Sequence, residues 1–210
     1  DSIAKTKIKL AKSQNTIKEQ INHYKEISQK HPVLISPYTE LNNFMALAPI
    51  FHEVLKVKTF PGATRSTNVF YWVWGWDGMT SNNSLAYWGD NNYLKQMLGC
   101  YMETADPVNG IVHAFRNDMS IASFSYTPSQ AIYISMLYLY YCQTHDLDEV
   151  KKRYDFSKKI FEKILALEVN NTGFCEGFSL FPDFPKFMKE TGKDASLFNN
   201  SLFYSAARSL

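Results

Sequence analysis

The sequence predicts an all-α protein in which helical hairpins repeat, as they do in an α/α toroid. Two observations carry this prediction. Amphipathic helices alternate along the chain with helices that are apolar nearly all round, and long connections alternate with short ones. In a toroid the inner helices are buried on both sides and the outer helices are half exposed, which is the pattern expected here.

The first helix is expected over residues 3–28, a stretch rich in Lys, Gln, Ile and Glu. Its apolar residues form one narrow stripe made of Ile8, Leu10, Ile17, Ile21 and Tyr24. We therefore predict a solvated helix that lies against a larger body, and we assign residues 1–35 to a linker helix. His31-Pro32 should end this helix, because the residue before a proline disfavours helical geometry.

The next helix is predicted to open at Ser36-Pro37, a capping residue followed by proline in the first helical position. Its buried face repeats at three and four residues through Leu41, Phe44, Ala48, Phe51 and Leu55. Pro49 should kink or divide it. A long polar loop then leads from Lys56 to a stretch rich in tryptophan.

Two hairpins are expected in the middle of the chain. After Asp77 a short helix should run to about Tyr87, and Gly89-Asp90 should turn the chain into a helix over 91–104. A second long loop follows over 105–126. Thr127 and Gln130 then fit a capping box with Pro128 first in the helix, and residues 131–142 are apolar on both faces.

The last part of the chain repeats this order. A brief turn at 144–146 leads to an amphipathic helix over 147–168, then a third long loop over 169–194 and a last apolar helix from Ala195. If the repeat is a toroid, the three long loops open on one rim. Functional residues are commonly presented by such loops on a rigid scaffold.

The composition excludes several classes of function. A formal net charge of +2 and no Lys/Arg cluster beyond the first thirty residues argue against nucleic acid. Three cysteines without metal-type spacing predict neither a disulfide framework nor a metal site, and no cofactor is expected. Apolar runs are too short for a membrane span, and no signal peptide is visible, so the compartment stays open.

Residues 72–78, Trp-Val-Trp-Gly-Trp-Asp-Gly, place three tryptophans beside one carboxylate. The apolar face of a sugar ring stacks on an indole, and a carboxylate accepts hydrogen bonds from sugar hydroxyls. Trp74, Trp76 and Asp77 are therefore candidate sugar-binding residues. The alternative is a buried aromatic cluster with a capping aspartate, because tryptophan is usually buried whatever its role.

The other two long loops carry further candidates. His113 and Arg116 in the second loop either orient sugar hydroxyls or pin the loop to the scaffold. Gln130 is a candidate binding residue that already has a structural task in the capping box. In the third loop Glu176 and Asp183 are candidate acids, although Asp183, in Phe-Pro-Asp-Phe-Pro, also suits a simple turn.

Four motifs in order resemble the six-hairpin (α/α)6 glycosidases, the group of trehalases, glucoamylases, debranching glucosidases and processing α-glucosidase I. Residues 74–78 look like the group's Trp-Asp motif, and residues 110–113, Gly-Ile-Val-His, look like its Gly-Ile-Pro-His loop. Residues 127–131 are similar to the start of its next inner helix, and residues 200–210 are similar to the inner helix that follows its general-acid loop. The resemblance covers the chain from about Tyr38 to Leu210.

The resemblance implies that residues 36–210 form three of six hairpins, the first half of a toroid. Both ends of the chain lie inside predicted helices, so we expect a longer protein that supplies the remaining half and an N-terminal domain. By resemblance Asp77 binds hydroxyls of the sugar that is cleaved, Asp183 is the general acid with Glu176 as the alternative, and the base lies beyond Leu210.

The expected activity is an exo-acting, inverting hydrolysis of a hexoside. An inverting enzyme needs its two carboxyl groups about 6.5–9.5 Å apart, so that a water fits between them, and opposite walls of a toroid provide that gap. The apolar neighbours of Asp183 would favour its protonated form. A helical carbohydrate-binding or interaction module without catalysis is the alternative, and a lyase is disfavoured because the charge is near neutral.

Overall fold

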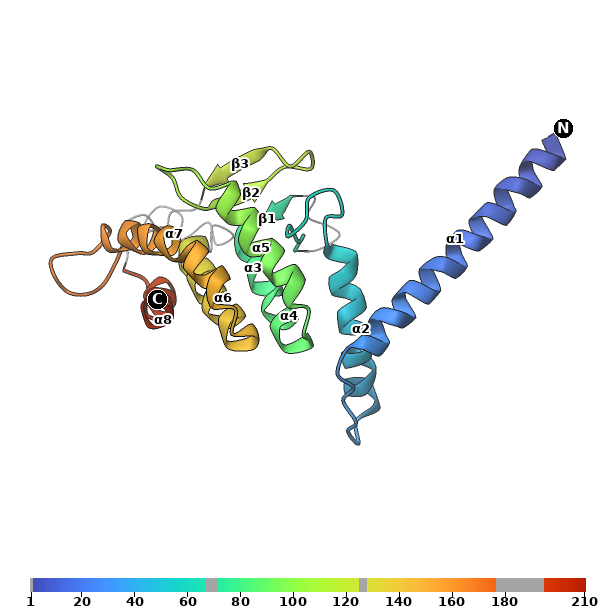
Figure 1. Cartoon of the computed structure of the whole chain (residues 1–210), viewed down its shortest axis with the longest axis horizontal. Coiled ribbons are helices and arrows are strands. Elements are labelled where there is room, and N and C mark those ends of the chain that lie inside the picture. The colour runs from blue at the N-terminus through green and yellow to red at the C-terminus, as the bar shows by residue number, and fades with distance from the viewer. Residues whose placement is uncertain (1, 67–71, 125–127, 177–194) are drawn as a thin grey trace. The chain divides into compact units, whose positions relative to one another are not determined.

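A computed structural model describes residues 2–66, 72–124, 128–176 and 195–210 (Figure 1). The chain divides into two compact units, Asp1–Val54 and Leu55–Leu210. Over the described residues it is mostly helical, and one small antiparallel sheet of three strands is added to the helices. The all-α prediction is thus right for most of the chain and incomplete at the sheet.

The first unit is a helical hairpin of α1 (Ser2–Lys30) and α2 (Thr39–Leu55, whose last residue belongs to the second unit). The two helices are joined by a hydrogen bond from Ser28 Oγ to Ala46 O (3.4 Å) and by an approach of His23 to Glu53 (3.8 Å). Pro49 lies within α2 without dividing it.

The predicted start of α2 at Ser36-Pro37 is wrong. The Asn42 side chain instead binds both backbone groups of Ser36, accepting from its N–H and donating to its carbonyl, each at 2.9 Å. The Ser36 hydroxyl accepts from the Tyr38 N–H (3.1 Å). These bonds close a turn ahead of the helix, so the first helical residue is Thr39.

The second unit begins with two short helices, α3 (Gly75–Ser81) and α4 (Asn83–Trp88), where one helix after Asp77 is expected. The break falls at Asn82, a buried residue whose Oδ1 accepts from the Thr64 hydroxyl (3.1 Å). Helix α3 also starts earlier than predicted, with Trp74 as its N-cap residue, so Asp77 lies in the first turn and is not the cap.

The remaining helices are α5 (Asn91–Glu103), α6 (Pro128–Thr144), α7 (Leu147–Leu165) and α8 (Leu197–Ser209), close to their predicted bounds. Aspartate or serine caps three of them. Asp90 accepts from the Tyr93 N–H (3.2 Å), Asp146 from the Glu149 N–H (3.1 Å), and Ser196 from the Asn199 N–H (3.2 Å). The expected short turns before α5 and α7 are therefore confirmed.

Helix α6 is the centre of the second unit and packs against α3, α4, α5, α7 and α8 (Figure 1). Its residues 131–134 are all buried, which requires contact on every side of the helix. Tyr138, one turn further, is 49% exposed. The prediction that both faces of this helix are buried is therefore right for its first half only.

The sheet is made of β1 (Val73–Trp74), β2 (Val112–Phe115) and β3 (Ile121–Phe124) in the order β1-β2-β3. Val73 is paired with Phe115 and Trp74 with Ala114. The second long loop is thus a β-hairpin for part of its length, which the sequence analysis missed. None of the helices within the described ranges is long and apolar enough to cross a bilayer.

Candidate functional site

The N-terminal ends of α3, α6 and α8 meet at one end of the second unit. A Cβ added to Gly75, the first residue of α3, would lie 3.4 Å from Ser129 Oγ of α6 and 2.5 Å from Val112 O of β2. The Trp76 ring of α3 packs edge-on against Phe198 of α8, with centroids 5.5 Å apart. Only glycine permits the close approach of Gly75 to Val112 O.

Trp74 and His113 form a direct contact at this end. Their ring centroids are 5.3 Å apart at an interplanar angle of 66°, because the pairing of Trp74 with Ala114 brings the neighbouring His113 alongside. Trp72 continues the row at 5.6 Å from Trp74 and is 39% exposed. The aromatic row Trp72–Trp74–His113 therefore runs from the surface to the start of α3.

The imidazole of His113 is neutral at neutral pH, because burial lowers its pKa below the ordinary 6.5. Among the residues that the structure describes, its buried Nδ1 has no hydrogen-bond partner. A neutral imidazole offers one donor and one acceptor, which suits a hydroxyl ligand.

Trp76 and Asp77 lie in the first turn of α3, where the helix dipole favours a negative charge. Both side chains are partly buried. Burial raises the pKa of the Tyr101 phenol well above its usual value, and the Asp77 carboxylate is among the charges that add to this rise.

Gln130 holds the loop before β2. Its Oε1 accepts from the Ile111 N–H (3.1 Å), its Nε2 donates to Asn109 O (3.2 Å), and Gly110 packs on the amide at a φ of +78°. The proposed cap Thr127 lies outside the described residues. The amide of Gln130 thus has a loop-holding role that its place in the sequence does not predict.

Arg116 is exposed at the end of β2 and binds the turn that follows. Its Nη1 donates to Ile121 O (2.7 Å) and approaches Ser120 Oγ (3.4 Å). These are the contacts of a residue that pins its loop, which was one of the two interpretations of the sequence.

Glu176 is held beside the first turns of α8. Its N–H donates to Leu167 O (2.9 Å), and the preceding Cys175 exchanges two hydrogen bonds with the Asn200 side chain (2.9 and 3.1 Å). Cys175, the residue before Glu176, is thus bound to the helix whose Phe198 contacts Trp76. Asp183 lies outside the described residues.

Arg65 lies beside α3 and was not singled out by the sequence analysis. The carbonyl oxygen of Thr64 would lie 2.8 Å from a Cβ on Gly78, so the backbone that carries Arg65 runs along α3. Its Nε is buried and has no hydrogen-bond partner in the described part of the chain. The only signal in the sequence was a lone arginine in a long loop.

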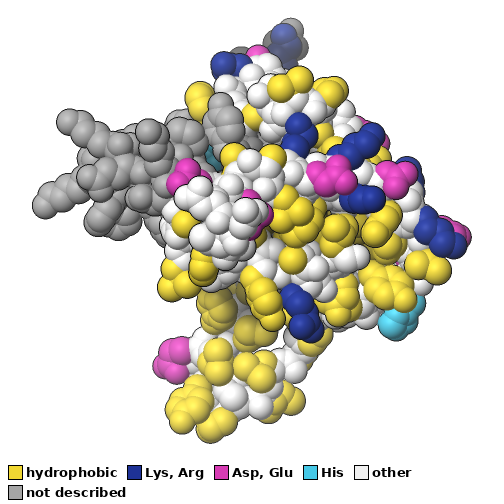
Figure 2. Space-filling view, turned by 90° about the vertical axis from the view of Figure 1, so that its left-hand side faces the viewer, with side chains coloured by type: hydrophobic (Ala, Val, Ile, Leu, Met, Phe, Trp, Pro, Cys, Tyr) yellow, Lys and Arg dark blue, Asp and Glu magenta, His cyan; other side chains and the backbone are white. Residues whose placement is uncertain are grey.

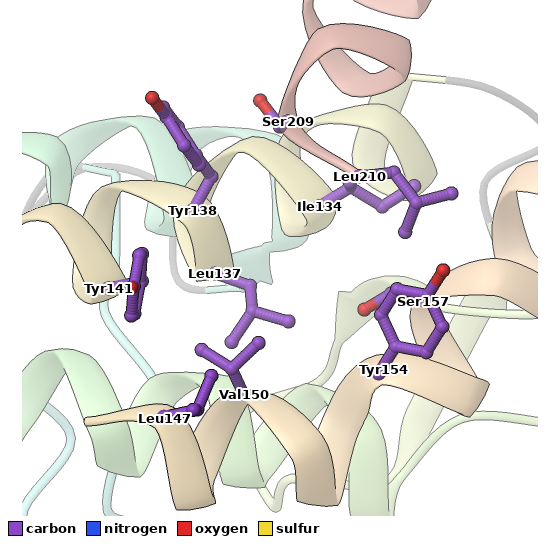
Figure 3. Close-up of a pocket in the computed structure, with 10 residues that line it drawn as sticks. All are labelled: Ile134, Leu137, Tyr138, Tyr141, Leu147, Val150, Tyr154, Ser157, Ser209 and Leu210. Carbon is purple, nitrogen blue, oxygen red and sulfur yellow. The ribbon is translucent and has the colours of Figure 1, made fainter. Parts of the chain in front are cut away.

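One cavity lies away from this site, between the second half of α6, the start of α7 and the end of α8 (Figure 3). It has a volume of about 280 Å³. Leu137 and Val150 point toward each other across it, and its rim carries Tyr138 and Tyr154. Its lining is apolar, without the carboxylates that glycoside hydrolysis requires.

No set of His, Cys, Asp and Glu residues within the described ranges could hold a metal ion. Cys100, Cys142 and Cys175 are free thiols. Comparisons of the chain with known protein families, with curated proteins and with solved structures found no match.

Proposed function

We propose that the chain is part of a glycoside hydrolase, exo-acting and inverting, that acts on a hexoside and needs no cofactor. The observation that supports this most is the convergence of α3, α6 and α8 at the end that carries Trp74, Trp76, Asp77 and His113. Aromatic rings beside a carboxylate and a neutral imidazole match the apolar faces and hydroxyl rim of a sugar.

In this proposal Trp74 and Trp76 bind the faces of the terminal sugar, and Asp77 accepts hydrogen bonds from its hydroxyls. His113 adds a neutral donor and acceptor beside Trp74. Arg116 and Gln130 have structural contacts, so we assign them to positioning the β2–β3 hairpin and the loop before it. Direct sugar contacts by these two residues are not part of the proposal.

The general acid is Asp183 or Glu176. The binding of its neighbour Cys175 to α8 supports Glu176 as the acid, whereas the sequence resemblance favours Asp183. The acid protonates the leaving oxygen while a second carboxylate, which we expect in a later hairpin, activates water on the opposite face of the sugar.

The toroid itself is part of the proposal, and the contrast between α6 and α8 supports it. Helix α6 is buried on every side over 131–134, whereas α8 leaves Leu197 84% and Tyr204 67% exposed. On the face that Figure 2 draws, hydrophobic side chains lie exposed among charged ones. Helices α3 and α8 bury the surface of α6. In the same way, further hairpins of the toroid would bury the exposed surface of α8.

The test uses the full-length protein and compares Asp183→Asn with Glu176→Gln on glycosides with poor leaving groups. Replacing the acid should lower kcat by about 10²-fold or more, because general acid catalysis contributes that much. It should have less effect on an activated aryl glycoside, whose leaving group needs little protonation. NMR of the first-formed anomer reports inversion.

Asp148→Asn serves as a control, because Asp148 is fully exposed on α7. If neither acid variant loses activity on the poor substrates, both assignments are wrong. If the wild-type protein binds saccharides in calorimetry and turns none over, the carbohydrate-binding alternative replaces the hydrolase.

A further inference from the structure

Helix α1 carries an exposed apolar line that the proposed activity does not use. Within the first unit, every described side chain from Lys5 to Asn22 is exposed. Leu10 and Ile17 are each 58% exposed, and Ile21 is 48% exposed. Most helical stability in proteins comes from packing of an amphipathic face, so this stretch is expected to have a partner surface.

The spacing of the apolar residues indicates that the partner surface is another helix. Leu10, Ile17 and Tyr24 recur every seven residues, the period of a helix that packs along another helix. The hydroxyls of Ser13 and Thr16 bind carbonyls of their own helix, Leu10 O (2.7 Å) and Lys12 O (2.9 Å), and need no partner. The line is narrow, and α1 contains no Trp or Phe, unlike helices that lie in a membrane surface.

The charge of α1 indicates the charge of the partner helix. Helix α1 has seven lysines and two glutamates, and both Glu19 and Glu26 lie about half a turn away from the apolar line. With Ile21 in the same seam, the flanking heptad positions include Lys18 and Lys25 and no carboxylate. Two copies of α1 would bring lysines together, whereas an acidic helix would neutralise them.

We propose that α1 binds an acidic amphipathic helix of another protein or domain, with Leu10, Ile17 and Ile21 in the seam. This interaction is separate from the proposed sugar site, since α1 belongs to the first unit and the site to the second.

The test uses the full chain and two synthetic four-heptad peptides with the same Leu/Ile core, one with Glu and one with Lys at the flanking positions. We expect the Glu peptide to bind at least about tenfold more tightly and to weaken with salt. The double variant Leu10→Asn/Ile17→Asn should lose at least about tenfold in affinity for it.

Lys12→Asn/Glu19→Asn is the matched control, because these exposed residues are also seven apart, lie on the opposite face, and leave the net charge unchanged. It should bind within about twofold of the wild type. Four results would overturn the proposal. They are equal binding of the two peptides, unchanged binding by the double variant, tighter binding to phosphatidylserine vesicles, and self-association in sedimentation equilibrium that the double variant abolishes.

Discussion

At the scale of single residues, Gly110 shows how one backbone conformation holds the loop before β2. Its φ is +78°, and an added Cβ would lie 2.5 Å from both Nε2 and Oε1 of Gln130. Gly173 has nearly the same φ, +76°, but a Cβ there would meet nothing within 4 Å. A substitution at Gly173 therefore causes backbone strain alone, whereas a substitution at Gly110 causes backbone strain and a collision with Gln130.

We expect Gly173→Ala to lower the free energy of unfolding by about 1 kcal/mol, the cost of a left-handed residue with a side chain. Gly110→Ala should cost about 1 kcal/mol more, because Gln130 must give up its bonds to Ile111 and Asn109. Urea unfolding of both variants measures the difference. Equal losses would mean that Gln130 moves aside without cost.

The residue scale is also where sequence prediction was least complete. Trp74 and His113 were both selected as candidates, and the structure brings them into contact. The bond from Gln130 to the Ile111 N–H spans nineteen residues. No local pattern predicts such a contact, and the capping box was the nearest pattern that the sequence offered.

At the scale of elements, helices were predictable and strands were not. A repeat of 3.6 residues is visible within one segment, and α1, α5, α6 and α7 follow their predictions closely. Strand β1 has two residues, and its partner β2 lies almost forty residues further along the chain. A strand of two residues is too short to show the alternation of apolar and polar residues that predicts a strand. Its distant partner cannot be recognised from the local sequence either.

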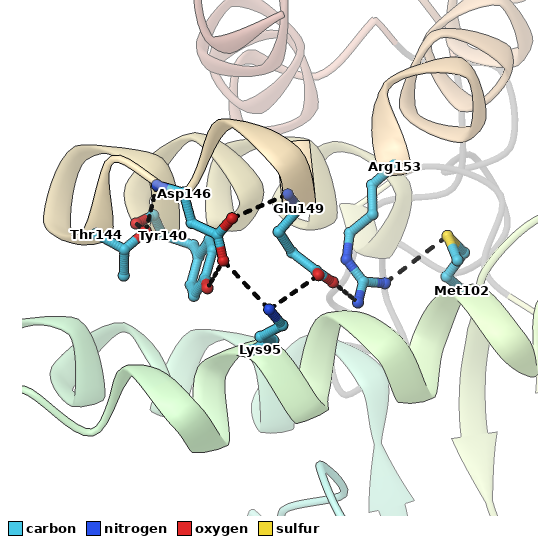
Figure 4. Close-up of polar contacts among 7 residues, drawn as sticks. All are labelled: Lys95, Met102, Tyr140, Thr144, Asp146, Glu149 and Arg153. Atoms are coloured by element: carbon cyan, nitrogen blue, oxygen red, sulfur yellow. Dashed lines mark hydrogen bonds and ion pairs between the residues drawn. The ribbon is translucent and has the colours of Figure 1, made fainter. Parts of the chain in front are cut away.

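The contact between α5 and α7 depends on a network of charges (Figure 4). Lys95 of α5 binds Glu149 (3.0 Å) and Asp146 (3.2 Å), and Glu149 also binds Arg153. The side chains of Glu149 and Arg153 are only 7% and 3% exposed. Removing one charge of a buried pair leaves the other uncompensated, which is strongly destabilising.

We expect Glu149→Gln to lower the free energy of unfolding by about 3 kcal/mol, because it leaves Arg153 buried without its counter-charge. Thermal and urea unfolding measure this loss. Asp148→Asn, one residue away and 99% exposed, should change stability by less than about 0.5 kcal/mol. A loss of the same size in both variants would refute the role of the buried pair.

The same network predicts acid sensitivity. Burial acts to raise the pKa of Glu149, but hydrogen bonds from Lys95 and Arg153 outweigh it and lower the pKa below 4.5. A lowered pKa in the folded state gives stability that is present above the unfolded value and is lost as pH falls through the folded value. Stability should therefore drop below about pH 4.5, and Glu149→Gln should flatten this drop.

At the scale of the whole molecule, the chain divides into two units with unequal cores. The buried residues of the first unit, among those described, are Pro49 and His52 of α2, whereas the second unit has a continuous core around α6. Predicting the toroid from sequence rested on the order of helices and loops. The described part of the chain shows helices and a small sheet and no closed toroid, which the order of elements alone could not establish.

Unequal cores predict two unfolding transitions. All four tryptophans belong to the second unit, while α1 and α2 contribute 29 and 17 residues of helix to the circular dichroism signal. As urea is added, part of the ellipticity at 222 nm should be lost before tryptophan fluorescence changes. Ala46→Gly, at an exposed position of α2, should shift only the first transition, by about 1 kcal/mol. Glu149→Gln should shift only the second, and a single coincident transition in all three proteins would show that the two units unfold as one.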